Sequence, residues 1–163
     1  MNQPYSHLLQ LRHLRDALGE FATGVTVVTA RGADGRPLGV TINSFASVSL
    51  EPPLVLWSLG LKSSALAVFE SCRHYAINVL AADQIEFSQR FSQSQSDEFA
   101  GIALKVGAGD TPLLPGCCAS FECRNEMRYP GGDHLIFIGQ VENFQREEKP
   151  PLIFHGGRYC NLS

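Results

Sequence analysis

The stretch GVTINSFASVSLEPPLVLWSL, residues 39–59, decides how the rest of the chain is interpreted. Its even positions from Val40 to Leu50 are mostly apolar, which predicts one strand with a buried face. The other face consists almost entirely of small hydrogen-bonding groups, although Asn is depleted in strands. This face is either a strand surface in contact with water or a platform for a flat heteroaromatic ring whose polar edge needs hydrogen-bond partners. The polar residues concerned are Thr41, Asn43, Ser44, Ser47 and Ser49.

The flanking segments predict further strands. Pro52 and Pro53 end the first strand, and the apolar run LVLWSLG predicts a neighbour that is covered on both faces. Residues 25–29 and the loop 32–37 predict a strand and turn that lead into it. Residues 74–81 predict another strand, and residues 118–129 and 134–145 predict a hairpin joined by PGGD.

Two or three helices are expected beside these strands. Residues 6–21 place leucines at spacings of three and four, which is typical of an amphipathic helix. A second helix would follow Ser63 or Ser64, since either hydroxyl can serve as the N-cap. A third would begin at Asp83, and the polar segment after it, with its Ser/Gln run at 92–96, predicts a loop or a short helix.

Together these elements indicate a mainly β, antiparallel barrel with flanking helices, because closure of the sheet removes exposed edges. The βαβ alternation of a Rossmann fold is absent, and no GxGxxG motif occurs. The 163 residues are enough for a single domain, 1–163, in which residues 1–13 form an N-terminal arm or the start of a helix.

Composition narrows the class of protein. The formal charge of −3 and the pI near 5.9 argue against nucleic-acid binding, which needs a basic surface. No apolar run is long enough to span a membrane, and the first residues do not resemble a secretory signal. Five cysteines without CxxC or zinc spacing predict reduced thiols and a cytoplasmic protein. Only 18% of residues are charged, which suggests surface covered by a second subunit or a ligand.

Three further clusters carry possible chemistry. Lys62, Ser63 and Ser64 precede a predicted helix and either bind phosphate or form an ordinary cap with a solvated lysine. Asp133 and His134 follow a Gly-Gly turn, so His134 is either an acid/base or a hydrogen-bonded structural histidine.

Near the C-terminus, Arg158 and Tyr159 follow two glycines, and the arginine either binds phosphate or a ring or makes a surface salt bridge. No G-x-S-x-G motif supports a hydrolase, and no carboxylate pair suggests glycoside chemistry.

Eight motifs in one order resemble the flavin reductase family with the FMN-binding split-barrel fold, the reductase components of two-component flavin monooxygenases. They run from about residue 14 to residue 159 and read FATGVTVVTA, GVTINSFASVSLEPPLVLWSL, KSS, YAINVL, DEFAGI, PLLPGCCASFECR, GDHLIFIGQV and PLIFHGGRY. Each motif alone is modest, and the ordered set is specific. The resemblance implies an antiparallel split β-barrel of Greek-key type, a homodimer with flavin near the subunit interface, and a separate monooxygenase partner.

The resemblance also assigns roles to residues. It implies that Asp133 and His134 lie where the nicotinamide enters, and that the remaining site residues bind flavin. The implied flavin-binding residues are Thr41, Asn43, Ser44, Ser47, Val48, Ser49, Lys62, Ser63, Ser64, Asn78, Arg90, Phe91, Arg158 and Tyr159. No metal is implied.

The implied reaction is hydride transfer from NADH or NADPH to FMN or FAD, with the hard chemistry supplied by the cofactors. His134 would then orient the nicotinamide rather than transfer a proton. Two alternatives stay open: a flavin carrier without reductase turnover, and a flavin oxidase like the pyridoxamine-phosphate-oxidase split barrels, which need a more basic site. FMN and FAD both stay open as the flavin, and NADH and NADPH as the nicotinamide.

Overall fold

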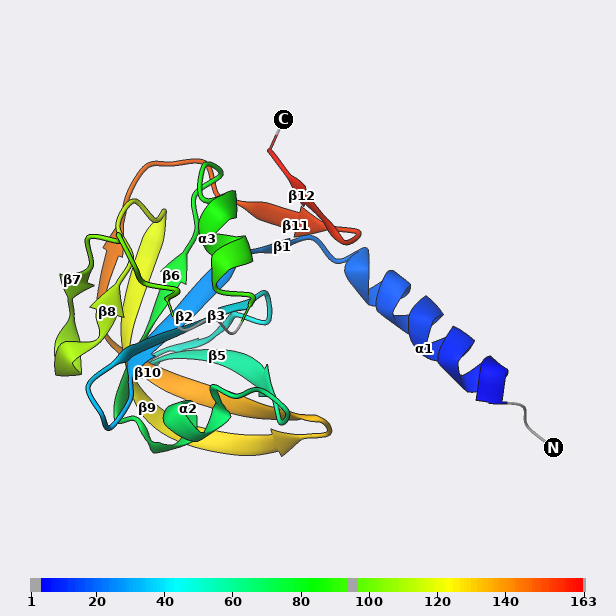
Figure 1. The fold of residues 1–163 in the computed structure, drawn as a ribbon, viewed down its shortest axis with the longest axis horizontal. Coiled ribbons are helices and arrows are strands. Elements are labelled where there is room, and N and C mark those ends of the chain that lie inside the picture. The colour runs from blue at the N-terminus through cyan, green and yellow to red at the C-terminus, as the bar shows by residue number, and fades with distance from the viewer. Residues whose placement is uncertain (1–3, 94–96, 163) are drawn as a thin grey trace.

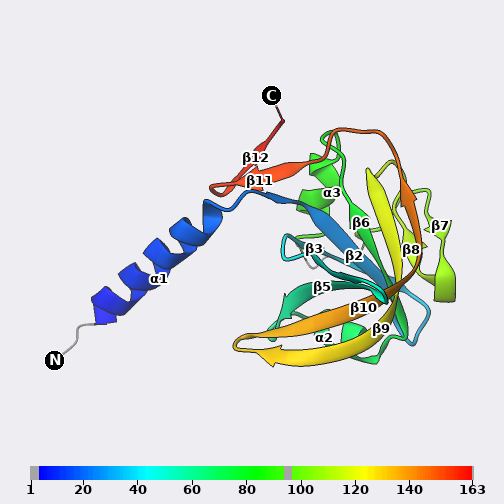
Figure 2. The same ribbon diagram turned by 180° about the vertical axis from the view of Figure 1, so that it is seen from behind.

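The computed structural model describes residues 4–93 and 97–162, and within them the protein is mainly β with three α-helices (Figures 1 and 2). The helices are α1 (Pro4–Gly19), α2 (Leu66–Ser71) and α3 (Ile85–Arg90), and Ala108–Asp110 form a short 3-10 turn. The strands are β1 (Thr23–Gly24), β2 (Thr26–Arg31), β3 (Pro37–Ile42), β4 (Ala46–Leu50), β5 (Pro53–Gly60), β6 (His74–Val79), β7 (Lys105–Val106), β8 (Pro112–Leu113), β9 (Ala119–Gly131), β10 (His134–Arg146), β11 (Ile153–His155) and β12 (Arg158–Cys160).

Seven of the strands form one antiparallel sheet in the order β3-β2-β6-β9-β10-β5-β4. Its two edge strands, β3 and β4, are consecutive in the chain and are joined by residues 43–45. β1, β11 and β12 form a separate three-stranded sheet, and β7 pairs with β8. The described strands include no pairing between β3 and β4, so the expected antiparallel, mainly β fold is confirmed, whereas the sheet itself is open.

The hairpin of β9 and β10 is confirmed and is the longest among the described residues, with 13 residues in each strand. Its turn is Gly132–Asp133, and Gly132 has φ of +67°, a conformation that residues with a side chain rarely adopt. His134 therefore begins β10 directly after the turn, opposite Gly60 at the end of β5.

The expectation of one continuous strand over residues 39–50 is wrong. β3 pairs with β2 and ends at Ile42, and β4 pairs instead with β5 at the opposite edge of the sheet. The Oγ atom of Ser44 accepts the backbone N–H of Ser58 at 2.9 Å and donates to the Ser58 carbonyl at 3.1 Å, which fixes the crossing. As a result the apolar face does not continue, and Leu50 is 93% exposed.

The expectation that β5 is covered on both faces is also wrong. Its burial alternates, with Val55, Trp57 and Leu59 buried and the residues between them half-buried. Trp57 stacks on Phe137 of β10 with ring centroids 4.5 Å apart, and it meets the edge of Phe69 of α2. Each such fully buried aromatic side chain contributes about 1.5–3 kcal/mol to folding, so this cluster fixes one half of the sheet.

A second buried cluster lies under α3 and includes Val27, Leu80, Phe91, Leu114 and Leu152. It joins β2 and the residue that follows β6 to the segment that leads into β11. This cluster supports the polar end of β3, where the candidate site lies.

The helices follow the sequence pattern with shifted boundaries. α1 confirms the first predicted helix and extends away from the sheets (Figures 1 and 2). The N-cap of α2 is Ala65 rather than Ser63 or Ser64, because Ser63 instead accepts the Ala65 N–H at 3.3 Å within the preceding turn. α3 begins two residues after Asp83. No helix within the described residues is long and apolar enough to cross a membrane.

Candidate functional site

The polar end of β3 is held against α3 by Thr41. Its backbone N–H donates to the carbonyl of Phe91 at 3.0 Å, and its hydroxyl donates to the carbonyl of Ser88 at 2.8 Å. The Oγ atom of Ser88 in turn lies 2.9 Å from the hydroxyl of Tyr159 on β12. Segments from three distant parts of the chain thus meet at one place, and they include the predicted residues Thr41 and Tyr159.

Two adjacent hollows run along β3 from this point. The first, about 240 Å³, is lined by Val25, Thr41, Ile42, Asn43, Ser88, Ser92, Phe154 and Tyr159. The second, about 310 Å³, is lined by Leu38, Gly39, Val40, Ser63, Ser64, Ala65, Phe91, Ser92 and Glu98. Ser92 lines both, so the hollow at the polar end of β3 and the hollow at the Ser63–Ser64 turn are neighbours.

Asn43 lies where two hollows meet. It lines the first hollow and also a larger one of about 640 Å³ between α1 and β11. Its side-chain amide makes no hydrogen bond to any residue that the structure describes. A donor and an acceptor are therefore open to a ligand here.

Ser47, Val48 and Ser49 lie on the edge strand β4. Ser47 pairs with Val55 and Ser49 with Leu54, so the register slips at Val48 and forms a bulge. Bulges on edge strands often lie beside active sites, since they turn backbone groups away from the ladder. The hydroxyl of Ser44, by contrast, already forms hydrogen bonds with the backbone of Ser58.

The turn that contains Lys62 meets the turn that contains Asp133. The backbone N–H of Leu61 donates to the Asp133 carbonyl at 2.9 Å. The carboxylate of Asp133 lies 2.7 Å from Nδ1 of His134, and this hydrogen bond lowers the pKa of Asp133. Nearby Lys62 lowers it further. Two clusters that are 70 residues apart in the sequence therefore form one exposed, polar corner.

Three of the predicted residues have roles inside the protein. Asn78 is fully buried, and its amide donates to Val27 and Thr29 and accepts the backbone N–H of Leu114. Arg90 donates to the carbonyls of Asp97 and Ala100 and so holds the following turn.

Phe91 is buried against Phe99 and contributes to the wall of the second hollow. Arg158 is exposed and has no hydrogen bond or ion pair from its side chain to the described residues.

The structure adds residues that the sequence pattern does not single out: Ser88, Ser92, Glu98 and Phe154. Glu98 is only 7% exposed and accepts the backbone N–H of Gly39 at 2.9 Å. Burial raises the pKa of its carboxyl above the ordinary value. Its only sequence signal is its place in DEFAGI, where an acidic residue beside Asp97 suggests solvent.

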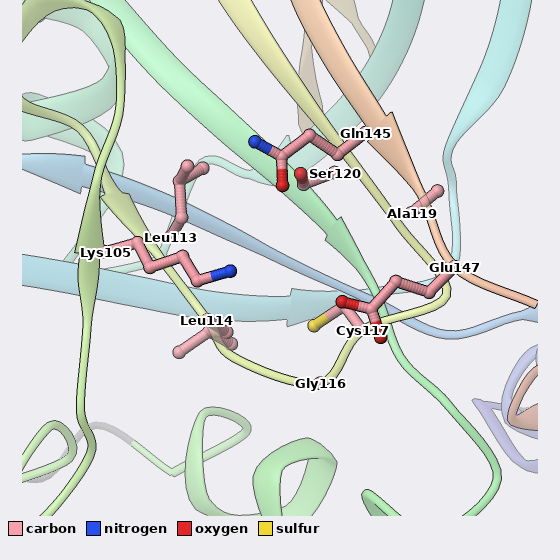
Figure 3. Close-up of a pocket in the computed structure, with 9 residues that line it drawn as sticks. All are labelled: Lys105, Leu113, Leu114, Gly116, Cys117, Ala119, Ser120, Gln145 and Glu147. Atoms are coloured by element: carbon pink, nitrogen blue, oxygen red, sulfur yellow. The ribbon is translucent and has the colours of Figure 1, made fainter. Parts of the chain in front are cut away.

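A further, small hollow lies beside β7, β8 and the start of β9 (Figure 3). Lys105, Cys117 and Glu147 line it, and its volume of about 20 Å³ is enough for roughly one water molecule. Burial raises the pKa of Cys117 to about 12, so this thiol is protonated and unreactive near neutral pH. Within residues 4–93 and 97–162, no group of His, Cys, Asp or Glu is placed to hold a metal.

Comparison with known proteins gives one consistent result. The model of the family described as flavin reductase like domain matches residues 18–163. The chain is 45% identical to FMN reductase (NADH) SmoA of Agrobacterium fabrum over 152 residues, which cover 93% of this chain and 86% of that protein.

Two other matches differ in coverage. The chain is 44% identical to the reductase component of the flavin-dependent trigonelline monooxygenase of Acinetobacter baylyi over 92% of its length, but it spans only 48% of that protein. Among solved structures, the NADH:FAD oxidoreductase SgcE6 of Streptomyces globisporus, in complex with NAD and FAD fragments, superposes with a TM-score of 0.89 and 35% identity. That match covers 100% of this chain and 96% of the other.

Proposed function

The chain belongs to the flavin reductase like domain family, and we propose on this basis that it is an NAD(P)H-dependent flavin reductase that supplies reduced FMN or FAD to a separate monooxygenase. The observation that carries the proposal is the 45% identity to an FMN reductase (NADH) over 93% of this chain. The relative that is a monooxygenase reductase component supports the partner.

The residues at the candidate site fit a flavin. The two hollows along β3 are together of the size expected for a cofactor pocket. Phe154 and Tyr159 supply an apolar wall, and the unpartnered amide of Asn43 supplies a donor and an acceptor for a ring edge. In our proposal the ring lies in the first hollow, and the Lys62–Ser64 turn holds the phosphate.

A bound flavin would supply the two-electron chemistry by accepting a hydride from the nicotinamide. The protein must hold the two rings with the reacting atoms about 3–3.5 Å apart and keep water out. Thr41 and Tyr159, both tied to α3, would fix the shape of the flavin pocket. Donors of the Ser47–Ser49 bulge would stabilise the negative charge that develops at the ring edge.

His134 and Asp133 would orient the nicotinamide. The 2.7 Å contact between them restricts the rotation of the imidazole, and both side chains are open to an incoming ligand. Hydride transfer between two bound rings does not need a protein acid or base, so we assign His134 a positioning role. In the same proposal, Arg158 contacts the ligand, whereas Asn78 and Arg90 support the fold.

We further propose that residues 1–163 form one split-barrel domain whose split lies between β3 and β4. Residues 1–3, 94–96 and 163 lie outside the described part of this domain, and residues 4–13 lie within α1. All five cysteines are free thiols, which favours a cytoplasmic location.

The arm α1 favours a homodimer. It exposes Leu8, Leu11, Leu14 and Leu18 at spacings of three and four, and a second copy would cover this stripe. The hollow of about 640 Å³ beside α1 reaches Asn43, so the flavin would lie near the interface. Sedimentation velocity tests this: the wild type should be a dimer, and a Leu11→Gln, Leu14→Gln variant should shift toward monomer.

The decisive experiment is anaerobic mixing of the purified protein with NADH or NADPH and each of riboflavin, FMN and FAD. A reductase bleaches the flavin absorbance near 450 nm as the nicotinamide is oxidised. Binding of flavin without bleaching would identify a carrier instead. Rapid reduction by a substrate amine in place of a nicotinamide would identify an oxidase.

A further inference from the structure

Glu98 is a buried carboxylate that the proposed reaction does not use. One of its oxygens, Oε1, accepts the Gly39 N–H at 2.9 Å. The other oxygen has no hydrogen bond to a described residue, although the side chain belongs to a residue that is only 7% exposed. Glu98 forms no ion pair within the described residues, because the guanidinium of Arg90 donates to backbone carbonyls, but the charge of Arg90 still lowers the pKa of Glu98 and offsets part of the effect of burial.

The open oxygen lies at a hollow rather than in packed core. Glu98 lines the second hollow together with Ser63 and Ser64, and Leu38 and Phe91 make this hollow partly apolar. Burial raises the pKa of Glu98, because the carboxylate loses hydration that its surroundings do not fully replace. A negative charge placed here is therefore sensitive to any second negative charge in the same hollow.

We propose that Glu98 sets the flavin preference of the site by disfavouring a terminal phosphate monoester. This inference rests on the proposed function, in which the turn of Ser63 and Ser64 holds the flavin phosphate. Near pH 8 a phosphate monoester carries a charge close to −2 on one phosphorus, whereas the diphosphate of FAD spreads the same total charge as −1 on each of two phosphorus groups. Repulsion grows with the product of the charges and falls with distance, so at the phosphorus held by the turn it is strongest for FMN, weaker for FAD and absent for riboflavin.

The variant Glu98→Gln tests the proposal, because glutamine removes the charge and still accepts the Gly39 N–H. Dissociation constants for riboflavin, FMN and FAD are measured by fluorescence quenching at pH 8 and low ionic strength. We expect FMN to bind about tenfold more tightly to the variant, FAD about threefold, and riboflavin within twofold of the wild type. An equal change for all three ligands, or no change for FMN, would overturn the inference.

The matched control is Glu86→Gln on the exposed face of α3, which makes the same change in net charge. All three dissociation constants should stay within twofold of the wild type. If Glu86→Gln tightens FMN as much as Glu98→Gln does, the effect is one of overall charge and the local inference is wrong.

A second variant, Glu98→Ala, also removes the charge and should tighten FMN relative to riboflavin by about the same factor as Glu98→Gln. The monomethyl ester of FMN has the same ring and ribityl chain but one negative charge fewer on its phosphate, so either variant should tighten it only about threefold. Lys62 is present in all these proteins, so its attraction for each ligand cancels in the comparison, and the inference fails if FMN and the ester respond alike. If the wild type oxidises no nicotinamide with any flavin, the proposed function fails; if it does so and the flavin preference does not depend on Glu98, only this inference fails.

Discussion

Asn78→Ala and Asn43→Ala make the same chemical change at two residues that the family resemblance assigns to one site, yet they should affect different properties. Asn78→Ala should lower the stability of the fold, and Asn43→Ala should weaken flavin binding. The amide of Asn78 makes three hydrogen bonds, at 2.9, 3.0 and 3.0 Å, and is fully buried. Its removal leaves the backbone N–H of Leu114 without a partner, which costs about 1–3 kcal/mol, and the two lost donations cost about 1 kcal/mol each. The free energy of unfolding should therefore fall by about 3–5 kcal/mol, a large part of the ~5–15 kcal/mol typical of a domain.

Asn43 gives the contrasting result. Its amide has no partner within the described residues and its side chain is exposed, so Asn43→Ala should change the free energy of unfolding by less than about 0.5 kcal/mol. If flavin buries this amide, the lost hydrogen bonds should weaken flavin binding by roughly tenfold or more.

Urea denaturation followed by circular dichroism measures the first quantity, and titration of flavin by fluorescence quenching measures the second. The folded fraction of Asn78→Ala should bind flavin as the wild type does. The reasoning is refuted if Asn78→Ala unfolds at the same urea concentration as the wild type, or if Asn43→Ala binds flavin with unchanged affinity.

Four other predictions concern single substitutions around the site. A Cβ on Gly39 would lie 2.6 Å from the ring of Phe91, so Gly39→Ala should lower the free energy of unfolding by about 1–3 kcal/mol. The control Gly24→Ala, whose Cβ meets nothing within 4 Å, should leave it unchanged. Equal urea midpoints for the two variants would contradict this prediction. In flavin titrations Lys62→Ala should weaken FMN more than riboflavin, whereas equal losses would leave the turn without a phosphate role. His134→Ala should keep the flavin Kd but raise the KM for NADH and slow single-turnover reduction, and loss of flavin binding and thermal stability together would instead indicate a structural histidine. Burial raises the folded-state pKa of Glu98 above its ordinary 4.5, so the folded protein loses stability as pH rises past 4.5. Glu98→Gln should therefore have a higher Tm than the wild type at pH 7, and the difference should vanish toward pH 4. A lower Tm of the variant at pH 7 would count against this account.

Local patterns were sufficient where neighbours in the sequence are also neighbours in space. The hairpin of β9 and β10 could be predicted because Gly132 permits the turn and both strands are long. The break between β3 and β4 could not, because Asn43 and Ser44 fit a period of two as well as any strand residues do. What ends β3 is the bonding of Ser44 to Ser58, which depends on strands not yet assembled.

The same limit applies to the site. An asparagine that binds ligand and one that binds backbone look alike in sequence, so Asn43 and Asn78 could be separated only by their burial and partners. Glu98 is a stronger case, because a glutamate in a polar segment is expected to be solvated. Here Phe91 and Phe99 pack around the backbone of Gly39, and the carboxylate of Glu98, which is bonded to that backbone, is buried.

The seam between β3 and β4 has a mechanical consequence. Elsewhere in the sheet, separating two strands breaks a ladder of hydrogen bonds, but across this seam the described residues form no ladder. The ties recorded near it are the two hydrogen bonds between Ser44 and Ser58, which staple the crossing segment to β5. The seam is therefore closed by packing rather than by a ladder, with Ile42 of β3 and Phe45 of the crossing segment against the buried cluster around Trp57, while six strand pairs hold the rest of the sheet together.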